Sequence, residues 1–211
     1  MISVITGDLI NSRLIANPQE WIEPLKSLFA SIGPNPKSWE IYRGDSFQVE
    51  IVQPEYVFFN ALRIKATLKC FKELDVRMGI GIGEASYKAD RITESNGAAF
   101  IYSGEQLERL KKDKQTLAIK SPWPVFDQEM NLFIRLGLIA MDNWKPKTAE
   151  LVRCYLDHPD KGQQEIADIL GINQSSVSER QTRAHLSEIL ELDAMFREKL
   201  KTYIANDHPV T

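Results

Sequence analysis

Hydrophobic and polar positions in the first 120 residues alternate between the spacing of a strand and that of a helix. The run MISVITGDL (1–9) is β-branched and stops at a Gly-Asp turn, which predicts a buried strand. In WEIYRGDSFQVEIV (39–52) two short alternating runs flank an Arg-Gly-Asp turn, which predicts a hairpin. Two further strands are expected over 75–85 and 116–119.

Apolar residues at helical spacing predict helices over 21–32, from Pro54 onward, and over 97–110. The order is then strand, helix, hairpin, helix, strand, helix, strand. A hairpin nested between two crossover helices is typical of the ferredoxin-like arrangement, a mostly antiparallel sheet with helices on one face. We therefore expect an α+β fold.

The strand over 75–85 carries a glycine at every second position, namely Gly79, Gly81 and Gly83. Because side chains alternate between the two faces of a strand, these glycines leave one face bare. Either another backbone or a ligand could approach closely there.

The chain changes character after SPWP (121–124). The next segment, VFDQEMNLFIRLGLIAMDNW (125–144), is unusually apolar for a surface helix, so we expect it between domains or against a second chain. Within it, 125–141 is the surface through which we expect a homodimer to pair. A helix over 145–157, a pair of short helices over 163–185 and a charged helix over 192–205 follow.

Composition indicates a globular protein. Of the 211 residues 43% are hydrophobic and 26% charged, and no apolar run reaches the length that spans a bilayer. Cys70 and Cys154 lie in separate apolar segments without a metal-binding spacing, as expected of reduced core thiols. We expect a cytoplasmic protein with no membrane partner.

Charge restricts any binding to nucleic acid. Residues 1–139 hold 17 basic and 17 acidic side chains, and residues 140–211 hold 9 basic and 12 acidic ones, a net charge of −3. Proteins that bind nucleic acid are usually basic where they meet phosphates. Contact with DNA must therefore be weak, dimeric or made by a local patch.

The segment QQEIADILGINQSSVSERQTRAHL (163–186) predicts a helix-turn-helix. Ala167 is a small contact residue, Gly171 a turn residue, and Val177 an apolar residue on the inner face of the second helix. Ser175 is the expected N-cap. The residues expected to contact DNA are Gln174, Ser175, Ser176, Glu179, Arg180, Gln181 and Arg183, with the two arginines near phosphates.

The stretches EIADILGIN and SSVSERQTRA resemble the C-terminal helix-turn-helix of bacterial sigma factors. One departure is that Arg180 and Gln181 stand where those proteins usually bury an apolar residue. A pair of helices used only for dimerisation remains the alternative, since a motif can carry fold without function.

Two Gly-Asp turns are candidates for a ligand site. Asp8 ends the first strand, and Gly44 and Asp45 form the tip of the hairpin. In a ferredoxin-like sheet both carboxylates could converge at one end, as a shared Mg²⁺ and a nucleotide polyphosphate require. The alternative is that each is a turn with an Asx hydrogen bond and no ligand.

The stretches GDL, RGDSF and RMGIGIGE resemble the catalytic core of class III nucleotide cyclases and GGDEF domains. This resemblance implies Asp8 and Asp45 as metal ligands. The asparagine and arginine that act in those families fall on Ile101 and Glu105, so an active cyclase is not expected. No cofactor is then required, whereas binding of Mg²⁺ or a nucleotide stays open.

Taken together, VITGDLINSR, GDSFQ, RMGIGIGE, NGAAFIYSGEQLE and the helix-turn-helix resemble the SatD family of bacterial proteins. The resemblance implies an intracellular regulator built from a catalytically degenerate cyclase-like ferredoxin-fold domain over 1–122, a connecting apolar helix over 123–144 and a helix-turn-helix domain over 145–211.

Three functions compete at this point. The first is a DNA-binding transcriptional regulator whose cyclase-like domain senses a ligand or mediates dimerisation. The second is a nucleotide- or metal-binding protein or an enzyme whose helix-turn-helix only mediates assembly. The third is an interaction module with neither ligand nor DNA.

Overall fold

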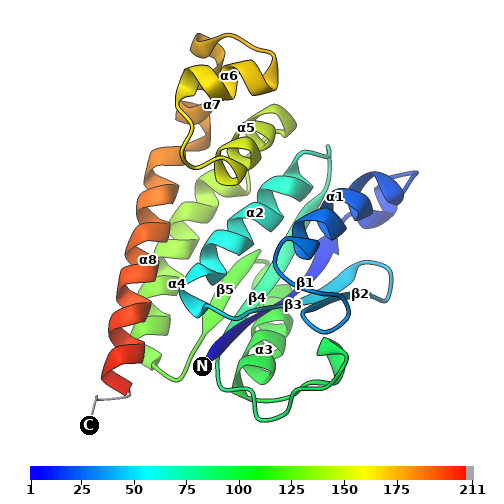
Figure 1. Ribbon diagram of the computed structural model, residues 1–211, viewed down its shortest axis with the longest axis vertical. Coiled ribbons are helices and arrows are strands. Elements are labelled where there is room, and N and C mark those ends of the chain that lie inside the picture. The colour runs from blue at the N-terminus through cyan, green and yellow to red at the C-terminus, as the bar shows by residue number, and fades with distance from the viewer. Residues whose placement is uncertain (208–211) are drawn as a thin grey trace.

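A computed structural model describes residues 1–207 and shows a mixed α+β fold with one five-stranded sheet and eight α-helices (Figure 1). The strands are β1 (Ile2–Ile10), β2 (Trp39–Tyr42), β3 (Ser46–Ile51), β4 (Asp75–Gly83) and β5 (Leu117–Lys120). The helices are α1 (Gln19–Ala30), α2 (Val57–Lys69), α3 (Ala98–Asp113), α4 (Pro124–Met141), α5 (Pro146–Asp157), α6 (Gln163–Leu170), α7 (Gln174–Ala184) and α8 (Leu186–Asp207). Among these residues no helix is both long and apolar enough to cross a bilayer.

The sheet has the strand order β2-β3-β1-β4-β5. The central strand β1 pairs antiparallel with both β3 and β4, and only β5 joins in parallel, next to β4. The hairpin β2–β3 turns through three residues, of which Arg43 and Gly44 have positive φ. The order of strands and helices in this part of the chain is the one that its hydrophobic pattern predicts.

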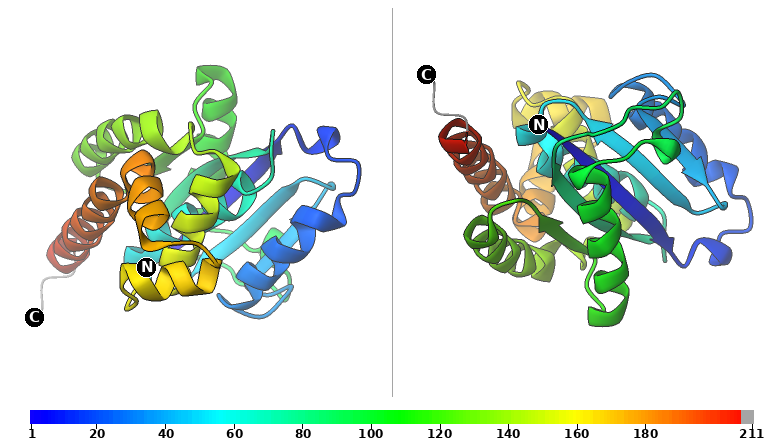
Figure 2. Two further views of the ribbon diagram at one scale, coloured as in Figure 1. Left: turned by 90° about the horizontal axis from the view of Figure 1, so that it is seen from above. Right: turned by 90° about the horizontal axis from the view of Figure 1, so that it is seen from below.

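Helices cover both faces of the sheet, so the expectation of helices on one face was wrong (Figure 2). On the first face Phe29 of α1 packs on Phe47 of β3, with ring centroids 5.2 Å apart, and α2 lies beside it. On the opposite face α3 packs on β4 and β1, where the hydroxyl oxygens of Thr6 and Ser103 lie 2.8 Å apart. The physical reason is the face of β4 that carries only glycines, because a helix backbone can pack as closely on such a face as a ligand can.

The helix α3 packs directly on the glycines of β4. A Cβ at Gly81 would lie 2.0 Å from the carbonyl oxygen of Ala99, and one at Gly79 would lie 2.3 Å from that of Ser103. The space left by the missing side chains is therefore filled by the α3 backbone. Of the two alternatives that the sequence left open, the structure shows the close backbone.

The main hydrophobic core continues from the sheet into the C-terminal helices. It joins β-strand residues such as Ile80 to Phe126 and Met130 of α4 and to Phe196 and Leu200 of α8. The helix α8 begins at Leu186, earlier than expected, because His185 alone, with φ of 51°, separates it from α7.

Candidate functional site

The α6–α7 pair is shaped by local signals in the chain. The backbone N–H of Gly162 donates to Glu165 Oε2 (3.0 Å) at the start of α6, and Gly171, with φ of 63°, ends it. Asn173 then caps α7 by accepting a hydrogen bond from the Ser176 backbone N–H at 2.8 Å. The expected cap, Ser175, is instead the second residue of α7, because the helix begins two residues earlier than predicted.

A small separate core holds α5, α6 and α7 together. Ile166 and Ala167 of α6 and Val177 of α7 are fully buried against Leu151 and Cys154 of α5. The residues that the spacing predicted as contact and inner-face positions therefore meet, and Gly171 forms the turn between them. In Figure 1 this unit forms one end of the molecule, with α6 and α7 beyond the body of the sheet.

The outer face of α7 is polar and exposed. Four of the residues predicted to contact DNA lie there, namely Gln174, Ser175, Glu179 and Arg183, together with Ser178 and Thr182, which the prediction omitted. Their spacing of three to four residues along α7 could have identified the two missed residues. The side chain of Arg183 is 67% exposed and forms an ion pair with Glu179 one turn earlier.

The remaining three predicted residues lie differently. The Arg180 side chain is 18% exposed, and its Nη1 lies 3.5 Å from Glu150 Oε2 and donates to the Lys147 carbonyl oxygen. Gln181 accepts a hydrogen bond from Gln163, and Ser176 is half-buried. Arg180 thus packs on α5, one turn after Val177, at the position where the resemblance to sigma factors leads one to expect a buried apolar residue.

Asp8 and Asp45 lie at the same end of the sheet. The Cα of Asp8 pairs with that of Ser46 across β1 and β3, and the Leu9 backbone N–H donates to the Asp45 carbonyl oxygen at 2.9 Å. The Asp45 carboxylate accepts a hydrogen bond from Ser12 Oγ at 3.1 Å. The expectation that the first strand stops at Asp8 was wrong, because β1 continues to Ile10 and Asp8 lies within it, paired with Ser46 and Arg77. The fold nevertheless brings the backbone of this strand beside the hairpin turn at Asp45, as a shared site requires.

The Asp8 carboxylate is already paired with cations. Arg77 Nη1 lies 3.2 and 3.1 Å from its two oxygens, and Lys111 Nζ lies 3.7 Å from Oδ2. Burial raises the pKa of Asp8 above its usual range, although Arg77 and Lys111 act in the opposite direction. Among the described residues no group of three or more His, Cys, Asp or Glu side chains is placed to hold a metal ion.

The two positions that the resemblance to cyclases assigns to catalytic groups lie on α3. Ile101 is exposed, and Glu105 forms an ion pair with Lys120 of β5. Neither residue offers a cation to a phosphoryl group.

Comparison with known proteins gives one match. The model of the SatD family matches residues 1–193 of the 211 residues, which includes the sheet, the α6–α7 pair and the first part of α8. No curated protein and no solved structure matches the chain. By the extent of this match, the chain belongs to the SatD family.

Proposed function

We propose that this protein is a DNA-binding transcriptional regulator whose α6–α7 pair is a helix-turn-helix. The observation that carries the proposal is the outer face of α7. It is exposed and polar at one end of the molecule, whereas on the inner face Val177 is buried against α5 and α6 and Ala184 is buried in the main core. A second helix held in this way, with its N-terminus exposed, can enter a major groove.

The polar face supplies groups suited to both parts of a DNA contact. We assign Ser175 and Glu179 to base edges or the backbone. The first turn of α7 offers the backbone N–H groups of Gln174 and Ser175 to a phosphate, since Asn173 already caps that of Ser176. Arg183 is the exposed cation of this face, since Arg180 is held by Glu150. Between residues 146 and 185 there are five basic and six acidic side chains, so the expected affinity is low and depends on dimerisation.

For the remainder of the chain we propose a ferredoxin-like domain of the nucleotide-cyclase type that has lost catalysis. The strand order and the hairpin between two crossovers support the fold, and β5 extends the sheet beyond the basic four strands. Ion pairing of Asp8 with Arg77 argues against a retained metal site. We therefore assign this domain a role in ligand sensing or in dimerisation.

The test is selection of bound fragments from a random pool of duplex DNA at low salt, followed by fluorescence anisotropy titrations. Wild type is compared with the double variant Ser175→Ala/Glu179→Ala and with Gln164→Ala, which alters an exposed residue of α6 outside the outer face of α7. We expect an enriched sequence, a loss of preference for it in the double variant and no change in the control.

Two outcomes would contradict the proposal. One is that no fragment is enriched and no duplex binds at low salt. The other is that the double variant and wild type give the same curves, in which case α7 does not read the DNA.

A further inference from the structure

One face of α4 keeps large apolar side chains in solvent. Val125, Leu132, Leu136 and Ile139 are 69%, 48%, 55% and 70% exposed. They are separated by seven, four and three residues, so they form a single ridge along the helix. This is the spacing with which one helix packs against another helix.

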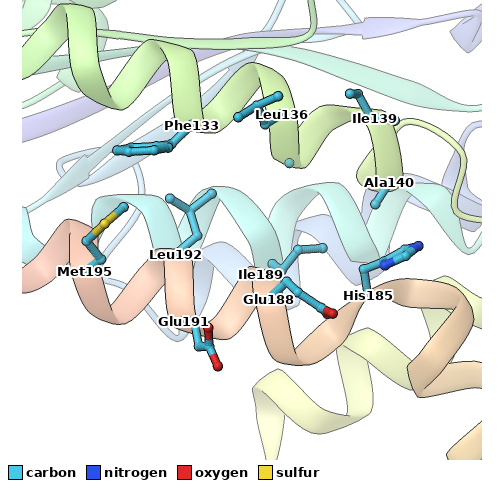
Figure 3. Close-up of a pocket in the computed structure, with 11 residues that line it drawn as sticks. Phe133, Leu136, Ile139, Ala140, His185, Glu188, Ile189, Glu191, Leu192 and Met195 are labelled. Atoms are coloured by element: carbon cyan, nitrogen blue, oxygen red, sulfur yellow. The ribbon is translucent and has the colours of Figure 1, made fainter.

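A groove of about 590 Å³ runs beside this ridge, between α4 and α8 (Figure 3). Its floor is apolar and is formed by Phe133, Gly137 and Ala140 of α4 and by Ile189, Leu192 and Met195 of α8. A Cβ at Gly137 would lie 3.2 Å from Met141 Cε and 3.4 Å from Leu192 Cδ2, so α4 and α8 approach each other closely at this glycine. Ridge and groove lie next to each other on the same side of the chain because Leu136 and Ile139 border both.

The charges on the two features are complementary. Glu188 and Glu191 of α8 lie along the groove, and Arg135 flanks the ridge, one residue before Leu136. Within residues 1–207 none of these three side chains forms an ion pair with its own chain. A second helix with an apolar ridge and an arginine beside that ridge would therefore fill the groove with its apolar side chains and pair its arginine with the carboxylates.

We propose that the α4–α8 face binds the same face of a second copy of this chain. The ridge of each α4 enters the α4–α8 groove of its partner, so two α4 and two α8 helices form a four-helix layer around a two-fold axis. Such a self-complementary surface is what a two-fold dimer uses. The proposed function uses this dimer to join two DNA-binding units, but the contacts that carry the inference do not depend on DNA.

The charge and shape of the face disfavour the other occupants. An anionic lipid surface would meet Glu188 and Glu191, and a DNA backbone would meet the same carboxylates. The groove runs along the second half of α4, from Phe133 to Ala140, and the ridge residues Leu136 and Ile139 lie beside it on the same face.

The test is the mass of the full chain, measured by light scattering and sedimentation over about 1–100 μM, the range in which a micromolar dimer dissociates. We expect wild type at twice 24.1 kDa, and Leu136→Glu and Ile139→Glu at 24.1 kDa. Val52→Glu is the matched control, because Val52 is 68% exposed and lies outside the face. All three positions are exposed, so the variants should keep the wild-type circular dichroism and melting temperature.

A wild type that stays monomeric throughout this range would overturn the inference and leave the groove to another protein or a lipid. A dimer that survives both glutamate variants would also overturn it. The DNA titrations report on the proposed function separately: a dimer that binds no DNA contradicts the function alone, and a monomer that binds DNA contradicts the dimer alone.

Discussion

Arg77 and Asp8 are direct partners across β4 and β1, and the Arg77 guanidinium lies 3.1–3.2 Å from both oxygens of the Asp8 carboxylate. Resemblance to the cyclases implies a metal ligand at Asp8. In this chain the neighbouring strand supplies a fixed positive charge to that carboxylate. A divalent cation would have to displace it and would be repelled by Lys111 as well.

Removal of the Arg77 guanidinium should expose a latent Mg²⁺ site at Asp8. In Arg77→Gln we expect millimolar Mg²⁺ to raise the melting temperature, because Asp8 then loses its nearest cation and keeps only Lys111, whose Nζ lies 3.7 Å from Oδ2. Wild type should show no such rise. The control is Arg77→Gln/Asp8→Asn, which should also show none. A rise in wild type, or in the double variant, would show that Mg²⁺ acts elsewhere or that Arg77 does not block the site.

Gly81 should tolerate no side chain. A Cβ there would lie 2.0 Å from the Ala99 carbonyl oxygen and 2.5 Å from the Ser103 nitrogen, both backbone atoms of α3. We expect Gly81→Ala to lower the free energy of unfolding by about 2 kcal/mol or more, the cost of overpacking against a fixed backbone. Urea denaturation checks this.

The matched control for that experiment is Gly104→Ala. Gly104 lies within α3, and a Cβ there would meet nothing within 4 Å. Because alanine favours a helix over glycine, this variant should be more stable by about 0.5–1 kcal/mol. Equal effects of the two substitutions would contradict the close packing of α3 on β4.

Substitution of the two arginines of α7 should change different properties, DNA binding for Arg183 and folding stability for Arg180. Arg183→Ala should weaken binding to all duplexes and reduce the slope of log K against log salt by about 1, with little change in stability. Arg180→Ala should cost about 1 kcal/mol of stability, because it removes the contact with Glu150 and the packing on α5. Anisotropy at two salt concentrations and urea denaturation measure both. A salt slope that changes in Arg180→Ala and not in Arg183→Ala would reverse the assignment.

Asp193 should give an unusual dependence of stability on pH. It is buried in α8, pairs with Arg197 through Oδ2, and its Oδ1 has no hydrogen-bond partner among the described residues. Burial raises the pKa of Asp193 above its usual range, and Arg197 only partly opposes this. A carboxyl group with a raised pKa in the folded state contributes stability at low pH that is lost as the pH rises through that value.

The measurement is the difference in free energy of unfolding between wild type and Asp193→Asn. Since asparagine does not titrate, the difference isolates this carboxyl group, and we expect it to fall as the pH rises above about 4, the usual pKa of an Asp carboxyl group. If the ion pair with Arg197 outweighed burial, the difference would rise over the same range.

Much of the fold could be predicted because its signals are local. A β-branched run located β1, although not its end, and alternation of apolar residues located the β2–β3 hairpin. The Ala167, Gly171 and Val177 spacing located the turn between α6 and α7. The N-cap was placed wrongly at Ser175, since Asn173, Ser175 and Ser176 all have suitable side chains and only the backbone path selects Asn173.

What the sequence by itself determined was the kind and order of the elements, because periodicity and turn chemistry act between residues that are close along the chain. Only the tertiary structure decided which groups meet across long separations. It placed α3 on the glycine face of β4, turned Arg180 onto Glu150 of α5, and set Arg77 beside Asp8. These contacts depend on how whole strands and helices dock. A residue's spacing shows which face it occupies, whereas packing decides what lies opposite that face.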